Sequence, residues 1–260
     1  MLKSLYTTAT GMKAQQTMVD MIANNIANVN TAGFKKSNAS FEDLLYVTLN
    51  TPGSQNGQSP TGLQIGSGTR LNSTTRVYNP GPLENSDRQL DIAIDGEGFF
   101  SVTLPDGSTG YTRDGQFQVN ASGQMTTSQG YILTPEITLP QDLLDVAIAP
   151  DGRVSGRTSG SPDTLTQFGQ IQIHRFINPS GLLAAGGNVA RLSDASGAAT
   201  TGTPGLNGLG NLKQGFIERS NVQIVNELVN LIVAQRAYEV NSRAIQASDQ
   251  MLSTATQIIR

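Results

Sequence analysis

The chain of 260 residues contains no cysteine and no tryptophan, and its only histidine is His174. The absence of cysteine excludes disulfides and thiolate-ligated metal centres. His174 lies in the alternating stretch QIQIHRF, where a lone histidine is typical of a packing or surface residue and not of a metal ligand. We therefore expect no metal and no cofactor.

Charged residues are also scarce. They make up 14% of the chain, against about 25% in an average soluble domain. The net charge is −3 and the pI about 5.2, which argues against a nucleic-acid partner because such binders present a basic face. A surface with little charge repels its own copies weakly and suits dense self-packing. A secreted, uncharged β protein explains the composition equally well.

Long apolar runs are missing as well. No stretch approaches the roughly 18 apolar residues of a membrane span. The N-terminal sequence MLKSLYTTATGMKAQQ lacks the apolar core and cleavage site of a secretory signal peptide. We expect no membrane insertion, and export, if it occurs, without a cleaved signal peptide.

The C-terminal stretch from Val222 to Ile259 has neither proline nor glycine. It predicts one long helix, which would span roughly 50–55 Å at about 1.5 Å per residue. Heptad-like spacing relates the apolar residues Leu228, Leu231, Tyr238, Ile245, Leu252 and Ile259. A second stripe runs beside them and contains Val225, Val229, Ile232, Ala244, Ala247, Met251, Ala255 and Ile258.

The N-terminal residues predict a second helix, from Leu2 to about Asn28. Its regularly spaced positions are Leu2, Leu5, Ala9, Met12, Gln16, Val19, Ala23 and Ile26. We predict the α+β fold class, with paired long N- and C-terminal helices that are coiled-coil-like and a central antiparallel β domain. Each helix has more apolar surface than one partner covers, so the pair should be better satisfied among many copies.

The middle of the chain has a different character. Glycine and proline recur between Asn50 and Gly62 and predict a loop, whereas Asp106-Gly107 and Asp114-Gly115 are hairpin signals. We expect a terminal helical domain (1–30 and 215–260), an extended connecting segment (31–69) and a β-rich outer domain (70–214). The expected β core comprises Ile92, Ile94, Phe99, Phe100, Val102, Phe117, Val119, Ile132, Val146, Ile148, Ile171, Ile173 and Phe176.

The sequence gives little evidence of catalytic residues. Asp95 with Glu97, or Asp106 with Asp114, could be imagined as the acid and base of a glycosidase. All four lie in turn sequences, where hairpin geometry already explains them. The sequence GLQIGSG has no following Lys-Ser/Thr and opens no helix, so it does not predict a phosphate loop. We predict that the protein is not an enzyme.

Asparagines cluster at the end of the N-terminal helix, at Asn24, Asn25, Asn28 and Asn30. They are poor helix formers in an otherwise helical run. A frayed, solvated helix end accounts for them, and so do hydrogen bonds between subunits. The residues alone leave both interpretations open.

Several longer motifs resemble the bacterial flagellar rod and hook axial protein family. They are ANNIANVNTAGFKK (23–36), FEDLLY (41–46), GLQIGSGTR (62–70), DGEGFF (95–100), YTRDGQFQV (111–119), TPGLNG (203–208) and GFIERSNVQIVNELVNLIVAQRAYEVNSRAIQASDQML (215–252). The likeness covers essentially the whole chain and is greatest to the members that form the distal rod. Residues 155–200 carry little recognisable pattern.

The resemblance implies a structural subunit of the distal rod in the flagellar basal body. Such subunits would form a straight, rigid tube that spans the periplasm, transmits torque and carries an export channel. The implied partners are further copies of the chain, proximal rod proteins, the hook protein, the P-ring and L-ring proteins and the flagellar type III export apparatus. In the family, the stretch corresponding to Val47–Pro60 is associated with a straight rod.

These expectations define two sets of site residues. The expected subunit interface contains Leu5, Met12, Val19, Asn24, Asn25, Ile26, Asn28, Leu228, Leu231, Tyr238, Ile245, Leu252 and Ile259. The expected rod-stiffening segment contains Val47, Leu49, Pro52, Gln55 and Pro60. The alternatives are a proximal rod or hook subunit, a secreted coiled-coil adaptor that forms a discrete oligomer, and a wall-degrading enzyme.

Overall fold

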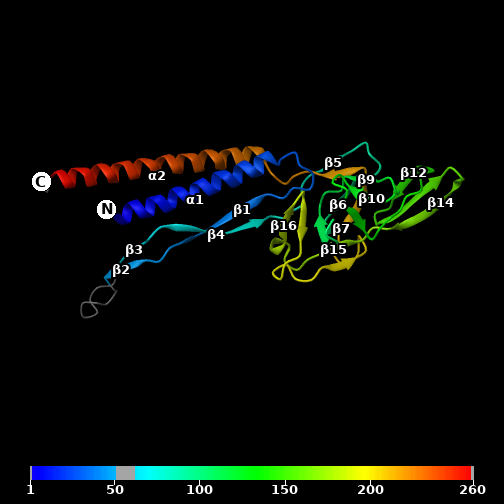
Figure 1. Cartoon of the computed structure of the whole chain (residues 1–260), viewed down its shortest axis with the longest axis horizontal. Helices are drawn as coiled ribbons and strands as arrows, with labels where there is room; N and C mark the ends of the chain where they lie inside the picture. The colour runs from blue at the N-terminus through cyan, green and yellow to red at the C-terminus, as the bar shows by residue number, and fades with distance from the viewer. Residues whose placement is uncertain (1, 51–61, 259–260) are drawn as a thin grey trace. The chain divides into compact units, whose positions relative to one another are not determined.

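The computed structural model describes residues 2–50 and 62–258. The chain divides into two compact units (Figure 1). The helical unit consists of residues 1–27, 37–75 and 223–260, and the β unit of residues 28–36 and 76–222.

Two long helices build most of the helical unit. α1 (Leu2–Ala27) and α2 (Ile224–Ile258) lie side by side and run in opposite directions (Figure 1). Gly11 lies where they approach closely, because a Cβ added there would be 3.1 Å from Nδ2 of Asn241. Ala14 and Ala234 are also buried. The lack of a side chain at Gly11 therefore lets the two helices approach closely at that point.

The coiled-coil-like pairing predicted for these helices is wrong. Leu228 and Tyr238 of the predicted stripe are 45% and 42% exposed, whereas Glu227, Ala234 and Ser248 are buried. A coiled-coil seam needs large apolar knobs that fill holes in the partner helix. Here the close approach at small residues turns much of the large apolar surface away from the seam. The central antiparallel β domain does fit the prediction.

The helical unit also contains an arm, which consists of two strand pairs. β1 (Ser37–Asp43) pairs with β4 (Thr69–Arg76), and β2 (Val47–Asn50) pairs antiparallel with β3 (Leu63–Ile65). Nζ of Lys3 in α1 donates to the Ile65 carbonyl at 2.9 Å. Gly68 has φ +113°, and a Cβ there would lie 2.2 Å from Oγ1 of Thr10. Only glycine therefore suits this contact between the arm and α1.

The β unit contains the remaining strands. They are β5 (Leu83–Asn85), β6 (Ile92–Asp95), β7 (Phe99–Thr103), β8 (Thr109–Thr112), β9 (Phe117–Val119), β10 (Met125–Thr127), β11 (Ile132–Thr134), β12 (Leu143–Ile148), β13 (Arg153–Thr158), β14 (Ser161–Gln170), β15 (Ile173–Arg175), β16 (Leu183–Gly186), β17 (Val189–Arg191), β18 (Thr200–Gly202), β19 (Asn211–Gln214) and β20 (Phe216–Glu218), with a short 3-10 helix at Pro179–Gly181. The largest sheet has the path β16-β17-β8-β7-β11-β10-β9, with β15 joined to β7 and β18. β12-β13-β14 form a second sheet, while β6 pairs with β19 and β5 with β20.

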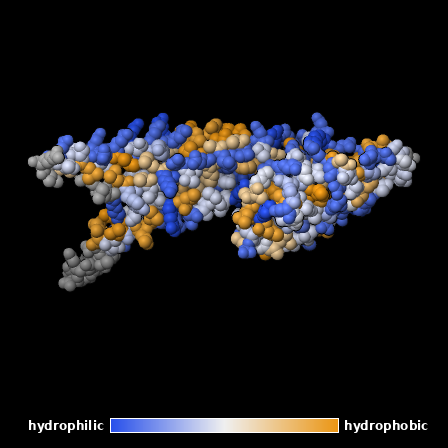
Figure 2. Space-filling view, in the orientation of Figure 1, coloured by the Kyte–Doolittle hydropathy of each residue, from blue (hydrophilic) through white to orange (hydrophobic). Residues whose placement is uncertain are grey.

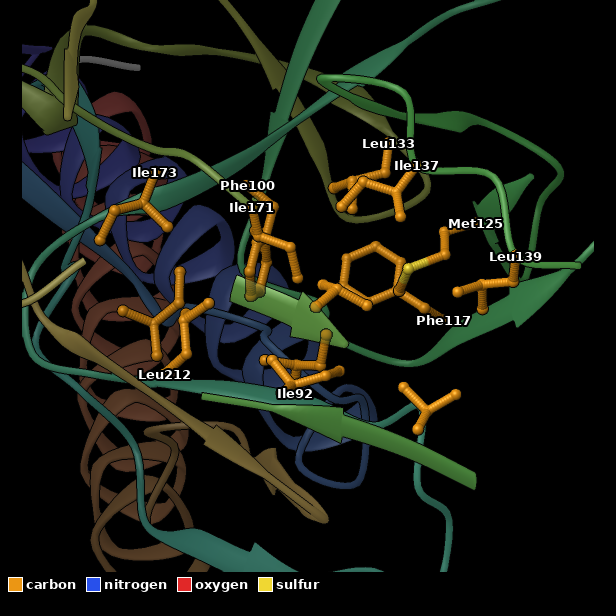
Figure 3. Close-up of a cluster of buried hydrophobic side chains, with 14 of the residues drawn as sticks. Ile92, Phe100, Phe117, Met125, Leu133, Ile137, Leu139, Ile171, Ile173 and Leu212 are labelled. Atoms are coloured by element: carbon orange, nitrogen blue, oxygen red, sulfur yellow. The ribbon is translucent and has the colours of Figure 1, made fainter. Parts of the chain in front are cut away.

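The core of the β unit is apolar and tightly closed (Figure 3). Phe100 and Phe117 are fully buried, and their rings meet edge to face with centroids 5.2 Å apart. Of the predicted core residues, Val119 is 42% exposed and Ile132 is half-buried, and the others are buried. The sequence prediction missed Met125, Leu133, Ile137 and Leu212, which are also buried.

We predict that Phe117→Ala lowers the free energy of unfolding of the β unit by about 3–5 kcal/mol, since it removes a fully buried ring and leaves a cavity. Urea denaturation followed by circular dichroism measures the change. Val119→Ala on the same strand is the matched control and should cost less than about 1 kcal/mol, because Val119 is already 42% exposed and its loss leaves no closed cavity. Equal losses in the two variants would contradict this assignment of the core.

Candidate assembly interface

The first half of α2 presents an apolar surface to solvent, visible as an orange patch along the helix in Figure 2. We call it the α2 outer face. Its residues and exposed fractions are Val225 (73%), Leu228 (45%), Val229 (54%), Ile232 (56%) and Val233 (62%). Apolar side chains of this size and number rarely gather on the surface of a protein that works as a monomer.

The outer face lies opposite the side of α2 that is buried within the chain. Successive residues of a helix turn by about 100°, so Val225, Val229 and Ile232 share one side. Ala234, which is 1% exposed, lies on the other side together with Ser248. A helix that is apolar on opposite sides needs two neighbours to bury both sides. α1 is one of these neighbours, and it leaves the outer face exposed.

A groove runs between the two helices next to this face. Gln16 and Val19 of α1 and Gln235, Tyr238 and Glu239 of α2 line it, and its volume is about 360 Å³. Its walls combine amide groups, one carboxylate and apolar carbon. A side chain with an apolar stem and a polar end fits such a lining better than a purely apolar one.

The arm has a second exposed apolar surface. Leu45 lies just before β2 and is 88% exposed, Leu49 of β2 is 61% exposed, and Leu63 of β3 is 55% exposed. A two-stranded ladder is marginally stable alone in water. The exposed leucines and the two-stranded pairing indicate that the arm gains from contact with another surface.

The structure distributes the predicted interface residues over both buried and exposed positions. Leu5, Met12, Val19, Ile26, Leu231, Ile245 and Leu252 are half-buried. Leu228 and Tyr238 are exposed, and Ile259 lies outside the described residues. In the predicted stiffening segment, Val47 and Leu49 are exposed on β2. Pro52, Gln55 and Pro60 also lie outside the described residues.

The predicted interface set leaves out Val225, Val229 and Ile232, which are more exposed than Leu228 and Tyr238 of the set. The signal for them is the second apolar stripe, which runs beside the heptad-like one. A stripe that one partner helix leaves uncovered is a candidate contact for another molecule. The close contact between Gly11 and Asn241 decides which stripe stays uncovered, and spacing alone does not reveal it.

Asn25 serves inside the chain. Its side chain is buried, its Nδ2 donates to the Ser37 carbonyl at 3.0 Å, and its Oδ1 accepts from the Ser37 amide at 3.0 Å. These two hydrogen bonds fix the first residue of β1 against the end of α1. Asn24 is exposed, and Oδ1 of Asn28 accepts from Oγ1 of Thr31 at 3.2 Å.

The acidic residues weighed as catalytic pairs have structural partners. Lys213 Nζ lies 2.7 Å from Asp95, and Arg175 Nε lies 3.2 Å from Glu97. Hydrogen bonds from Ser108, reinforced by Arg191, hold the pKa of Asp106 below its usual value. Burial raises the pKa of Asp114, which accepts a hydrogen bond from the Gln116 amide at 3.1 Å.

His174 and the other potential ligands are dispersed. His174 lies in β15, where Oγ1 of Thr201 is 3.0 Å from its Nδ1 and Tyr111 meets its ring edge to face. Within residues 2–50 and 62–258, no three His, Asp or Glu side chains are grouped so that they could hold a metal ion. Neither helix described is apolar enough over a sufficient length to cross a membrane.

Three protein-family models match the chain. They are "Flagella basal body rod protein" over residues 5–35, "Flagellar hook protein FlgE/F/G D1 domain" over residues 93–156, and "Flagellar basal body rod FlgEFG protein C-terminal" over residues 213–258. The first and last matches include most of α1 and α2. The middle match covers β7 to β12 and most of β13.

Curated relatives match along the full chain. The flagellar basal-body rod protein FlgG of Borreliella burgdorferi is 46% identical over 265 residues, which is 100% of both chains. The protein of that name from Buchnera aphidicola is 46% identical over 99% of this chain and 100% of its own. The one from Caulobacter vibrioides is 45% identical over 99% of each.

We predict that Asn25→Ala lowers the stability of the helical unit by about 1–3 kcal/mol, because it leaves the amide and carbonyl of Ser37 without their partner. The midpoint of urea unfolding, monitored by the helical circular dichroism signal, measures the loss. Asn30→Ala is the control, since Asn30 is exposed and should change the midpoint little. An unchanged midpoint for Asn25→Ala would contradict a structural role for this side chain.

Proposed function

This chain belongs to the flagellar basal-body rod protein family, and we propose that it self-assembles into the straight tubular shaft of the distal rod. It is a structural subunit of the rod in the flagellar basal body. The family is one of structural proteins, and we infer that the chain performs no catalysis. The function is then mechanical: the polymer transmits torque and leaves a central channel for later export substrates.

The α2 outer face is the observation that supports polymerisation best. It is apolar, exposed, and opposite the side on which α1 packs. A second copy that covers this face removes several large side chains from water, and each contributes about 1.5–3 kcal/mol. Repetition of the contact in every subunit makes a long polymer stable although one pair of helices is not. Leu228 and Tyr238, together with the half-buried Leu5, Met12, Val19, Ile26, Leu231, Ile245 and Leu252, complete the proposed interface.

The arm is proposed to brace neighbouring subunits. Leu45, Leu49 and Leu63 hold enough exposed apolar surface to dock on another copy. Lys3, Thr10 and Gly68 tie the arm to α1. A brace that is itself tied to a helix resists bending of the shaft.

The remaining partners follow from a position in the rod. We propose that the subunit contacts proximal rod proteins at one end of the shaft and the hook protein at the other, with the P-ring and L-ring proteins around it. We further propose that it spans the periplasm and leaves the cytoplasm through the flagellar type III export apparatus without a cleaved signal peptide.

We predict that Val229→Asp abolishes polymerisation while the monomer keeps its fold, because the new carboxylate would be buried unpaired at the subunit contact. Leu231→Asp is a less specific test, since Leu231 is half-buried within the monomer. Sedimentation and negative-stain electron microscopy of purified protein report the polymer, and circular dichroism reports the fold.

Gln246→Asp is the control for Val229→Asp, because it places the same charge at an exposed polar position of α2. Normal polymers from Val229→Asp would refute the proposed interface. A wild-type chain that forms one defined small oligomer at all concentrations would instead favour a discrete adaptor over a rod.

We predict that deletion of residues 47–60 leaves a polymer that bends, because the exposed apolar residues of β2 are lost from the brace. The persistence length of filaments in electron micrographs measures the stiffness. Replacement of the same residues by a Gly/Ser segment of equal length controls for chain length and should also give bending polymers. Straight, stiff filaments from the deletion variant would exclude the bracing role.

A further inference from the structure

A carboxylate lies at the centre of a buried charge cluster in the β unit. Glu218 ends β20, and its side chain is 1% exposed. Its Oε1 accepts hydrogen bonds from Lys35 Nζ at 2.6 Å and from the Gly81 amide at 2.8 Å. Its Oε2 lies 3.3 Å from Nη1 of Arg113. Two cations therefore share one buried anion.

Both cations are as deeply buried as the carboxylate. The side chains of Lys35 and Arg113 are 2% and 3% exposed. Lys35 also donates to the Asn79 carbonyl at 2.7 Å, and Arg113 to the Gly96 carbonyl at 2.7 Å. Burial lowers the pKa of Lys35 and of Arg113, and Glu218 opposes that shift in both. Without Glu218, Lys35 and Arg113 would lose their buried counter-charge, and only the exposed carboxylate of Glu97 would still act on Arg113.

The three residues come from distant parts of the chain. Lys35 and Glu218 are separated by 183 positions, and Arg113 and Glu218 by 105. The β unit ends at Val222, so Glu218 is almost its last residue. The strand before it, β19, pairs with β6 and delivers the buried Leu212 to the core. The complete β unit therefore includes buried residues from the C-terminal part of the chain.

We propose that Glu218 is a late latch: the β unit cannot close its core until Glu218 arrives to neutralise Lys35 and Arg113. Burial of a charge whose partner is missing is strongly unfavourable. A chain that emerges from its N-terminus first must then stay open until nearly all of it has been made. The latch does not depend on the proposed rod assembly, although a chain kept open in this way suits passage through an export channel.

The order of folding tests the latch directly. Full-length protein is refolded from urea, and pulse-labelling hydrogen exchange follows amides of β6, β7 and β20. The latch predicts that the core amides of Ile94 and Phe100 gain protection no earlier than those of Ile217 and Glu218. Core amides that become protected while β20 still exchanges freely would overturn the proposal.

Charge substitutions test the cause. Glu218→Gln keeps the size of the side chain and should lower the folding equilibrium constant by roughly 100- to 1,000-fold. Glu84→Gln is the matched control: it lies on β5, opposite β20, and its exposed ion pair with Arg219 should be worth about threefold or less. A Glu218→Gln variant that folds as well as Glu84→Gln would overturn the latch.

A third variant covers the case in which Glu218→Gln does not fold at all. Lys35→Met, Arg113→Met and Glu218→Met are combined, so that the charges are removed together and apolar volume remains. The latch predicts that this triple variant folds much better than Glu218→Gln, because no uncompensated charge is buried. A triple variant no better than Glu218→Gln would show that charge balance is not what closes the unit.

The pH dependence of the free energy of unfolding distinguishes an effect of charge from an effect of side-chain shape. The groups around Lys35 are Glu218 and Arg113, with Arg76 and Tyr78 on the wall of the adjoining small cavity. Since burial lowers the pKa of Lys35, the folded state binds its proton less tightly than the unfolded state does. Stability therefore rises as the pH increases toward the ordinary lysine value of 10.5. Glu218→Gln should show a steeper rise than wild type, and Lys35→Met with Glu218→Gln should lose that extra rise. Parallel pH profiles for Glu218→Gln and the double variant would contradict the charge mechanism.

Discussion

A helix that is apolar on two opposite sides cannot bury both sides against one neighbour, and this constraint governs the helical unit. α1 covers the side of α2 that contains Ala234. The side with Val225, Val229 and Ile232 stays in water. Burial of the second side needs another molecule, and the proposed polymer arises when that contact is repeated from copy to copy. A structural role in the rod agrees with this imbalance, because the shaft supplies the neighbours that the monomer lacks.

The β unit satisfies its own requirements differently. Its apolar core is closed around Phe100 and Phe117, so it needs no partner to bury its large side chains. Its last two strands nevertheless contribute to the interior. β19 pairs with β6 at the core, and β20 carries Glu218, the only carboxylate that contacts Lys35 and Arg113 among the described ion pairs. In the proposed rod, the helical unit is completed by other copies of the chain, whereas the β unit is completed by its own C-terminal strands.

Sequence motifs and local patterns predicted much of the secondary structure and the family. The period of the apolar residues predicted both terminal helices, and alternation in the middle identified most of the β core. Long motifs at both ends indicated the flagellar rod family, which the full-length relatives confirm. The asparagine cluster was ambiguous from the residues, and the structure shows that Asn25 bonds to the backbone of Ser37. That bond joins a helix end to a strand start, which no local pattern encodes.

The sequence by itself determined the existence and length of the helices, the strand-rich middle and the family, because these depend on local periodicity and on long specific motifs. The tertiary structure alone decided which helix stripe is buried, since that depends on the close approach at Gly11 and Asn241. It also decided that Lys35, Arg113 and Glu218 meet in the interior. A charged residue in a sequence is normally expected to lie at the surface. Only the fold can bring three charged residues that are distant in sequence together in the interior.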